Sequence, residues 1–174
     1  ETCALDMIGA EYVRSVNPGE LVQIANGKLV SATQFAEPSE HSDVFELVYF
    51  ARHDSVIRGQ RVDTVRRRFG AELAKMHAPI HDDQGATLVT AVPDTSVPAA
   101  EAYAHELGLP YQSAILKNRY IGRSFMQPTQ QSRENTLRLK HTMWPELVND
   151  KDIIMIDDSI VRGTTSMKIV QMMR

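Results

Sequence analysis

"IIMIDDSIVRGTTS", residues 153–166, joins an apolar run to two adjacent aspartates and then to a turn rich in hydroxyl groups. The run 153–157 predicts a buried strand that ends at the acidic pair. The carboxylates of Asp157 and Asp158 repel each other unless a cation or a polyhydroxyl ligand lies nearby. The turn that follows offers hydroxyls and backbone N–H groups at the start of a predicted helix, which is the chemistry of an anion site. The stretch therefore predicts a ligand with hydroxyl groups, a phosphate and a bound metal ion.

The acidic pair also has a simpler interpretation. Two aspartates at a strand end occur in solvated turns, where one carboxylate caps the following helix. The hydroxyl-rich turn directly behind the pair favours phosphate binding instead, because Gly163 allows the backbone to approach a ligand closely. The turn is not a P-loop, since no Gly-Lys-Ser/Thr follows a spaced glycine.

The composition is that of a folded globular protein. Of the 174 residues, 43% are hydrophobic and 24% are charged, which argues against disorder. The formal net charge of −3 gives no reason to expect a nucleic-acid partner. No apolar run approaches the roughly 18 residues of a membrane span and no signal peptide opens the chain, so we expect a soluble, cytoplasmic protein. The single cysteine excludes an internal disulfide.

Both ends of the chain look cut. It begins at Glu1 without an initiator methionine and stops at Arg174 inside a predicted helix. A parallel sheet entered at residue 153 normally receives another strand after that helix. We therefore expect a piece of a longer protein.

The pattern of residues predicts two parts. Residues 1–42 alternate short apolar runs with turn signals, and Asn26-Gly27 between two such runs predicts a β-hairpin. This β-rich part is too small to bury a core of its own. Residues 43–174 alternate strands with helices, which predicts an α/β fold with a parallel sheet flanked by helices. The predicted strands are 87–92, 111–116 and 153–157, and the predicted helices are 62–76 and 97–107.

The helix predicted at 62–76 is amphipathic. Its apolar residues recur at spacings of three and four, at Val62, Val65, Phe69, Leu73 and Met76. The run 66–68 consists of three arginines, which we expect on the solvated face of this helix.

The segment 117–150 has little hydrophobic periodicity and predicts a long connection without regular structure. Long connections in compact domains are often functional lids. Within 117–140 the only acid is Glu134, so we expect a lid that closes over a polyanion. The basic residues there are Lys117, Arg119, Arg123, Arg133, Arg138 and Lys140.

These motifs resemble the type I phosphoribosyltransferases, which use phosphoribosyl pyrophosphate (PRPP). Within that group, "LVYFAR", "VPDTSVPAA", "KNRYIGRSFMQP" and "DDSIVRGTTS" are similar to the glutamine PRPP amidotransferases. The opening "ETCALDMIGAEYVRSVNPGE" resembles the last part of their N-terminal glutaminase domain. The resemblance implies a C-terminally truncated type I phosphoribosyltransferase domain with a flexible lid at 43–174. It also implies that 1–42 are the remnant of an N-terminal-nucleophile glutaminase domain.

The resemblance implies a reaction, a cofactor and partners. In that family, ammonia released from glutamine displaces pyrophosphate from C1 of PRPP and gives 5-phosphoribosylamine, the first step of purine biosynthesis. The implied cofactor is Mg²⁺. The implied partners are PRPP, ammonia or glutamine, feedback purine nucleotides, a glutaminase portion of the same chain and further copies in a homo-oligomer. Two alternatives stay open, a non-catalytic PRPP-binding regulator and a phosphoribosyltransferase that uses a nucleobase.

Site residues follow from the same resemblance. Asp157 and Asp158 would bind ribose hydroxyls and the metal ion, and Thr95 would join the metal site. The implied PRPP-binding residues are Asp94, Ser96, Asp157, Asp158, Ser159, Ile160, Val161, Arg162, Gly163, Thr164, Thr165 and Ser166. The implied catalytic residues are Lys117, Arg119, Tyr120 and Arg123, of which the three basic ones would cover the pyrophosphate and the tyrosine would shape the ammonia path.

Two of the departures of the chain from the family pattern bear on its chemistry. The glutaminase nucleophile of the family is an amino-terminal cysteine, whereas position 1 here is Glu1 and Cys3 belongs to a downstream segment. We therefore expect Cys3 to be a buried, structural thiol. Some relatives carry an iron–sulfur cluster with one ligand just before the "YF" stretch, but this chain reads Asp43-Val44-Phe45 there. No such cluster is expected in this chain.

Overall fold

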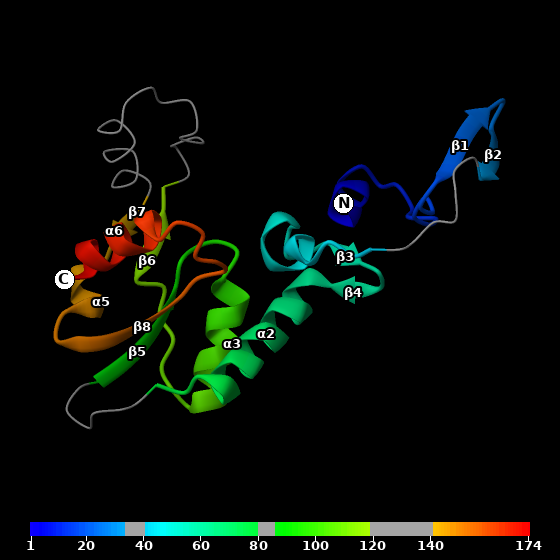
Figure 1. Cartoon of the computed structure of the whole chain (residues 1–174). Coiled ribbons are helices and arrows are strands. Elements are labelled where there is room, and N and C mark those ends of the chain that lie inside the picture. The colour runs from blue at the N-terminus through cyan, green and yellow to red at the C-terminus, as the bar shows by residue number, and fades with distance from the viewer. Residues whose placement is uncertain (34–40, 80–85, 119–140) are drawn as a thin grey trace.

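The computed structural model describes residues 1–33, 41–79, 86–118 and 141–174 (Figure 1). At the N-terminus, α1 spans Thr2–Met7, and β1 (Glu20–Ala25) pairs antiparallel with β2 (Lys28–Thr33). The turn residues Asn26 and Gly27 have φ values of 51° and 73°, which glycine and asparagine tolerate best. The predicted hairpin is thus confirmed. Helix α1 was not predicted, because six residues are too few to give a helical period.

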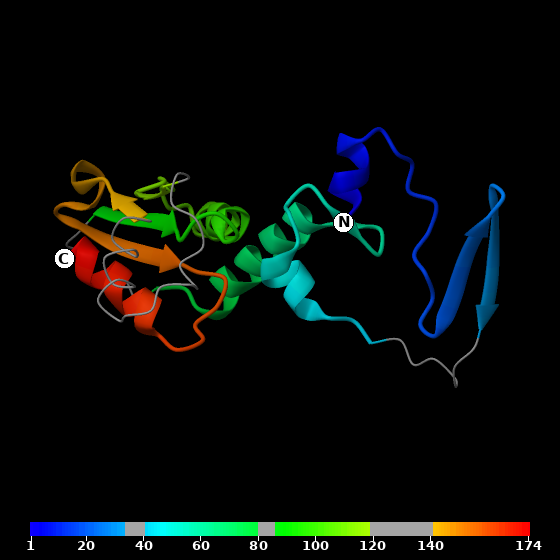
Figure 2. The same ribbon diagram turned by 90° about the horizontal axis from the view of Figure 1, so that it is seen from above.

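The hairpin stands away from the later part of the chain in both views (Figures 1 and 2). A π-helical turn, η1 (Glu46–Phe50), and a small hairpin of β3 (Val56–Ile57) and β4 (Gln60–Arg61) lead into α2 (Val62–Met76). Among the residues that the structure describes, no helix is both long and apolar enough to cross a membrane.

Helix α2 has the predicted bounds and buries Val62 and Val65 as predicted, but not the rest of the predicted apolar face. Phe69 and Met76, predicted to face the core, are 42% and 72% exposed, whereas Arg66 is only 2% exposed. The prediction of a solvated Arg66 was therefore wrong. The reason is that α2 packs along a row of small residues rather than along its largest apolar ones.

The close packing of α2 on α3 (Val97–Leu107) depends on Gly70. A Cβ atom at Gly70 would lie 1.9 Å from the carbonyl oxygen of Ala99, so any side chain there would force the two helices apart. Helix α3 keeps its predicted bounds and ends at Gly108, whose φ of 67° is the left-handed conformation typical of a helix end.

A parallel strand pair forms the centre of the fold. Strands β5 (Ala86–Ala91) and β8 (Lys151–Ile156) pair in parallel, with Ala91 opposite Ile156. On the other edge of β5, Tyr111 forms a single parallel bridge with Val89. The predicted parallel α/β arrangement is confirmed.

The strand predicted at 111–116 was too long. The chain turns at Ala114, whose N–H lies 2.9 Å from the carbonyl oxygen of Gln112 and 3.1 Å from the hydroxyl of Thr90. The next strand, β6 (Ile115–Lys117), pairs antiparallel with β7 (His141–Met143). Strand β7 and the one-turn helix α5 (Pro145–Val148) correct the prediction that 117–150 lacks regular structure, since both are too short to give a period.

Helices cover both faces of the β5–β8 pair, which gives three layers (Figures 1 and 2). On one face, Val89 and Ile156 belong to the same core cluster as Tyr103 of α3. On the other face, Ile115 of β6 packs with Ile169 of α6 (Thr164–Met173) in a second cluster. Because the two strands are parallel, the residues after β5 and after β8 emerge at the same edge of the sheet.

Candidate functional site

The loops that follow β5 and β8 meet in one polar cluster. The N–H of Val92 donates to the carbonyl oxygen of Ile156 at 2.9 Å, which keeps the two strand ends together. The hydroxyl of Thr95 donates to Oδ2 of Asp158, so the two loops are in direct contact. Ligands of open α/β sheets bind at this carboxyl edge.

The acidic pair is half-buried. Within the described ranges, neither Asp157 nor Asp158 forms an ion pair with a basic side chain. Oδ1 of Asp157 accepts the N–H of Asp158 at 2.9 Å, and Oδ1 of Asp158 accepts the hydroxyl of Ser159 at 2.9 Å. Burial, and then the charge of Asp158, raise the pKa of Asp157 to about 6. A cation or a hydrogen-bond donor at this place would be stabilised.

The oxygen donors fit Mg²⁺ that arrives with a phosphorylated ligand. No group of three or more His, Cys, Asp or Glu able to hold a metal ion occurs in the part of the chain that the structure describes. Mg²⁺ is usually bound by one or two carboxylates together with phosphates of the substrate, rather than by a cage made only of protein. Asp157, Asp158 and the hydroxyl of Thr95 could supply such a partial set.

The loop after the acidic pair leads into the N-terminus of α6. Gly163 caps this helix with a φ of 68°, and α6 begins at Thr164. The free N–H groups of a first helical turn and the positive end of the helix dipole favour an anion. In the predicted PRPP loop, the exposed residues are Ile160, Val161, Arg162, Thr164 and Thr165, and the half-buried ones are Ser159, Gly163 and Ser166.

The predicted residues after β5 lie in different surroundings. Nζ of Lys117 forms an ion pair with Oδ2 of Asp94 at 2.9 Å, and both side chains are about half exposed. Ser96 is 1% exposed, and its hydroxyl donates to the carbonyl oxygen of Val92. The structure thus brings Asp94, Thr95 and Lys117 to the acidic edge, while the Ser96 side chain points inward and is already hydrogen-bonded.

Three of the predicted catalytic residues cannot be placed. Arg119, Tyr120 and Arg123 lie outside the described residues, as do residues 124–140 of the predicted lid. Lys117 is the one predicted catalytic residue that the described ranges include. The roles of the other three stay predictions.

One buried cation near the site was missed by the sequence analysis. Burial lowers the pKa of Arg66 below its ordinary value, and among the charges that oppose this effect Asp158 has the largest influence. The available signal was the four-residue spacing of Arg66, Gly70 and Ala74, which puts the arginine in line with two small residues.

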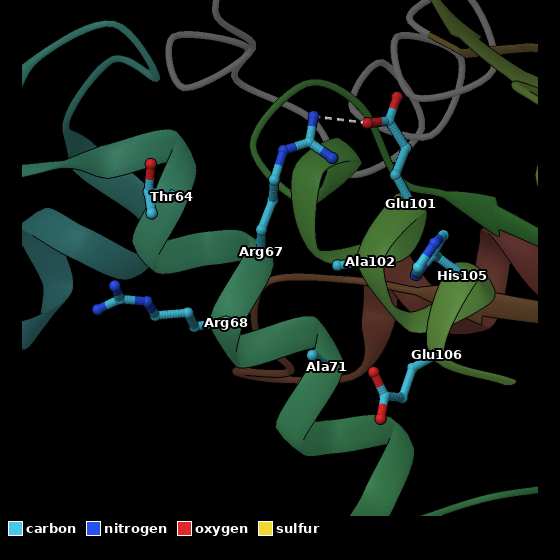
Figure 3. A pocket seen from close by; sticks show the side chains of 8 residues that line it. All are labelled: Thr64, Arg67, Arg68, Ala71, Glu101, Ala102, His105 and Glu106. Carbon is cyan, nitrogen blue, oxygen red and sulfur yellow. Dashed lines mark hydrogen bonds and ion pairs between the residues drawn. The ribbon is translucent and has the colours of Figure 1, made fainter.

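A groove of about 550 Å³ lies between α2 and α3 (Figure 3). Arg67, Glu101 and His105 are among its lining residues, and Arg67 forms an ion pair with Glu101 at 2.7 Å. None of the residues in the loops 92–96 and 157–163, which directly follow β5 and β8, lines this groove. It is therefore separate from the candidate site.

Known proteins resemble this chain along its whole length. No protein-family model matches the chain. The amidophosphoribosyltransferase of Synechococcus elongatus is 48% identical over 174 residues, which are 100% of this chain and 34% of that protein. The chain is homologous to the amidophosphoribosyltransferases. That of Mycobacterium tuberculosis is 45% identical over 175 residues, which cover 100% of this chain and 32% of that protein.

The solved structures of amidophosphoribosyltransferases give the same result. The glutamine PRPP amidotransferase from B. subtilis complexed with ADP and GMP matches with a TM-score of 0.85 and 42% identity, over 100% of this chain and 37% of that one. The predicted type I phosphoribosyltransferase fold is thus confirmed. The chain spans about a third of the length of the curated amidophosphoribosyltransferases that it matches.

Proposed function

We propose that the chain is the phosphoribosyl-transferring part of an amidophosphoribosyltransferase. The reaction transfers ammonia to C1 of PRPP and gives 5-phosphoribosylamine and pyrophosphate, the first step of purine biosynthesis. The observation that carries the proposal is the contact of Thr95 with Asp158, which unites the loops after two parallel strands in one acidic, hydroxyl-rich site. The likeness to curated amidophosphoribosyltransferases over the whole chain supports it.

The chemistry requires charge neutralisation more than a protein nucleophile. The nitrogen lone pair of ammonia forms the bond to C1, the bond from C1 to the pyrophosphate oxygen breaks, and the nitrogen then loses a proton. Positive charge develops at C1 and negative charge on the leaving group, so the protein must stabilise the pyrophosphate and exclude water.

We assign the parts of PRPP to the parts of the site. Asp157 and Asp158 accept hydrogen bonds from the ribose hydroxyls, and the loop 159–166 holds the 5′-phosphate at the start of α6. The loop at 94–96 lies beside the pyrophosphate, with Ser96 contributing through its backbone because its hydroxyl is bonded to Val92. Mg²⁺ bound by the two aspartates, Thr95 and pyrophosphate oxygens would supply positive charge for the departing group.

Lys117 would change partners when PRPP binds. Its ammonium group pairs with Asp94, and the pyrophosphate offers a stronger negative charge at the same place. By family resemblance, Arg119 and Arg123 cover the pyrophosphate with it, and Tyr120 shapes the path of ammonia.

The source of ammonia would be the glutaminase portion of a longer chain. Residues 1–42 would be the last part of that glutaminase portion, and residues 43–174 would belong to the phosphoribosyltransferase domain that follows it. Cys3, the only cysteine, is unsuited to that chemistry, because it is 4% exposed and its sulfur lies 3.1 Å from the hydroxyl of Ser55. The prediction of a buried thiol is confirmed. Purine nucleotides as feedback ligands, a homo-oligomeric assembly and a cytoplasmic location complete the proposal.

Pyrophosphate release tests the proposed function against its two alternatives. It is measured with Mg–PRPP and ammonium, glutamine or free purine bases, on the 174-residue chain and on the full-length protein. We expect release with ammonium in both and with glutamine only in the full-length protein. Binding of PRPP without any release would indicate a regulator, and release that requires a purine base would indicate a nucleobase enzyme. Glutamine-dependent release by the 174-residue chain would contradict the inert role of Cys3.

A further inference from the structure

Arg66 is the bulkiest side chain that the described part of the chain buries completely. Its Nε and Nη2 donate to the carbonyl oxygens of Leu47 and Ala51, both at 2.8 Å, and Nη1 lies 3.2 Å from Nδ1 of His53. Among the described residues, no carboxylate forms an ion pair with it. Arginine stays protonated, and an apolar side chain of similar volume is often at least as stabilising as a buried charge. Stability alone therefore does not explain a buried arginine at this position, and the geometry of its hydrogen bonds has to be considered.

The guanidinium fixes one segment at several points. Leu47 and Ala51 lie four residues apart, within and directly after η1, a turn closed by the N–H of Ala51 on the carbonyl oxygen of Glu46 at 3.1 Å. The N–H of Asp63 in turn donates to the carbonyl oxygen of His53 at 3.0 Å. A planar fork of donors can hold separate carbonyl groups in one fixed arrangement, which a single ammonium or an apolar side chain cannot. The segment 47–53 is thereby tied to the first turns of α2.

The residues that follow are tied to the N-terminus of the chain. The N–H of Arg52 donates to Oε2 of Glu1 at 2.8 Å, and the hydroxyl of Ser55 lies 2.7 Å from the same oxygen. The N–H of Val56 donates to the hydroxyl of Thr2 at 2.7 Å. Ser55 is fully buried, whereas Glu1 and its contact with Arg52 are exposed. The segment 51–56 is thus held by α2 on one side and by the first residues of α1 on the other.

The middle of α2 packs against α3, the helix that begins at the candidate site. Gly70 brings α2 against Ala99 of α3, and α3 begins directly after the loop at 94–96. Continuous contacts therefore run from Glu1 through the segment 51–56, Arg66 and α2 to the loop that we assign to pyrophosphate. Arg66 lies in the middle of this series and touches no residue assigned to PRPP.

We propose that Arg66 is a positioning residue that fixes residues 1–8 in one register against the phosphoribosyl site. The inference rests on the proposed function. In an enzyme that receives ammonia from a preceding glutaminase portion, the position of residues 1–8 relative to the phosphoribosyl site decides whether ammonia reaches C1 of PRPP or escapes to water. Free ammonia reaches C1 from solution and does not depend on the register.

The test compares glutamine-dependent with ammonia-dependent turnover in the full-length protein at saturating Mg–PRPP. For Arg66→Gln we expect the glutamine-dependent rate to fall by about tenfold and the ammonia-dependent rate by less than about twofold. Ser55→Ala loosens the far side of the same segment by a smaller change and should lower the same ratio. Arg67→Gln is the matched control. It removes an arginine from the same helix, but one that is partly exposed and paired with Asp63 and with Glu101. Figure 3 shows the pair with Glu101. The ratio should therefore not change.

Hydrogen exchange gives a second readout that does not depend on activity. Arg66→Gln should speed exchange in 46–56 and in 1–8, and Arg67→Gln should not. An unchanged ratio in both Arg66→Gln and Ser55→Ala would overturn the proposal, as would unchanged exchange in 1–8. If the unaltered protein shows no turnover with ammonia, the proposed function fails instead, and the exchange in 1–8 still decides whether Arg66 positions this segment.

Discussion

Thr95 and Asp158 are 63 residues apart in the chain, and the hydroxyl of Thr95 donates a hydrogen bond to the carboxylate of Asp158. The contact exists because β5 and β8 are parallel and end together at Ala91 and Ile156. Neither loop alone distinguishes a ligand site from a solvated turn. Together they place two carboxylates, which form no ion pair within the described part of the chain, beside a hydroxyl and the start of a helix.

Asp157→Asn should stabilise the ligand-free protein at neutral and basic pH. Burial and the charge of Asp158 raise the pKa of Asp157 to about 6, from an ordinary value of 3.8. The folded state binds the proton more tightly than the unfolded state, so stability declines as the pH rises from about 4 through 6. Because the group is only half-buried, we expect the free energy of unfolding to rise by about 1–2 kcal/mol at about pH 8 and to change little at about pH 4.

Urea unfolding in the presence of EDTA at both pH values measures this effect. Asp152→Asn, in an exposed position of the same strand, is the control and should change the free energy of unfolding by less than about 0.5 kcal/mol. A variant Asp157→Asn that is less stable than the unaltered protein at about pH 8 would mean that the carboxylate is well accommodated in the empty site.

Lys117→Met should impair catalysis far more than folding. The ion pair of Lys117 with Asp94 is exposed, so its loss should cost less than about 1 kcal/mol of stability. A charge-assisted contact with pyrophosphate contributes roughly 1.5–3 kcal/mol, so the ammonia-dependent kcat/KM for PRPP should fall by about tenfold to a hundredfold. Lys75→Met is the control, since Lys75 pairs with Glu72 on the exposed side of α2. Equal kcat/KM in the two variants would remove Lys117 from the site.

Gly70→Ala should destabilise the protein by about 2–4 kcal/mol, although alanine is normally the better helix former. The added methyl would lie 1.9 Å from the carbonyl oxygen of Ala99, and backbone cannot move away as a flexible side chain can. Glu72→Ala, exposed two residues later on the same helix, should be nearly neutral. Thermal unfolding of both variants gives the comparison, and a stable Gly70→Ala would show that α2 and α3 can separate at low cost.

Local patterns predicted much of the fold. The Asn26-Gly27 turn, the bounds of α2 and α3 and the strand before Asp157 all depend on residues close together in the chain, and the structure confirms each of them. The turn at Ala114 was missed because it involves Thr90, which lies on another strand. The burial of Arg66 was missed for a similar reason, since carbonyl groups of a preceding segment accept its hydrogen bonds.

The candidate site was predicted to a similar extent. The motif identified Asp157, Asp158 and the loop behind them. The resemblance gave site roles to Asp94, Thr95 and Lys117, which the structure brings to the same edge of the sheet. The orientation of Ser96 could not be read from the motif. Ser96 directly precedes α3, and its hydroxyl donates to the carbonyl oxygen of Val92, four residues earlier. Whether such a hydroxyl bonds to the backbone or points toward a ligand depends on the local backbone conformation.

The acidic pair is the centre of the account, and the affinity for PRPP in the presence of Mg²⁺ tests it most directly. Titration calorimetry compares the unaltered protein with the double variant Asp157→Asn/Asp158→Asn, which removes both charges and keeps the shape of the side chains. A second double variant, Asp150→Asn/Asp152→Asn, removes two charges at the opposite end of β8 and serves as the control. We expect the affinity of the first variant to fall by about tenfold or more, which is roughly 1.4 kcal/mol, and that of the control to stay unchanged. Equal affinity of the first variant and the unaltered protein would contradict the assignment of this site to PRPP.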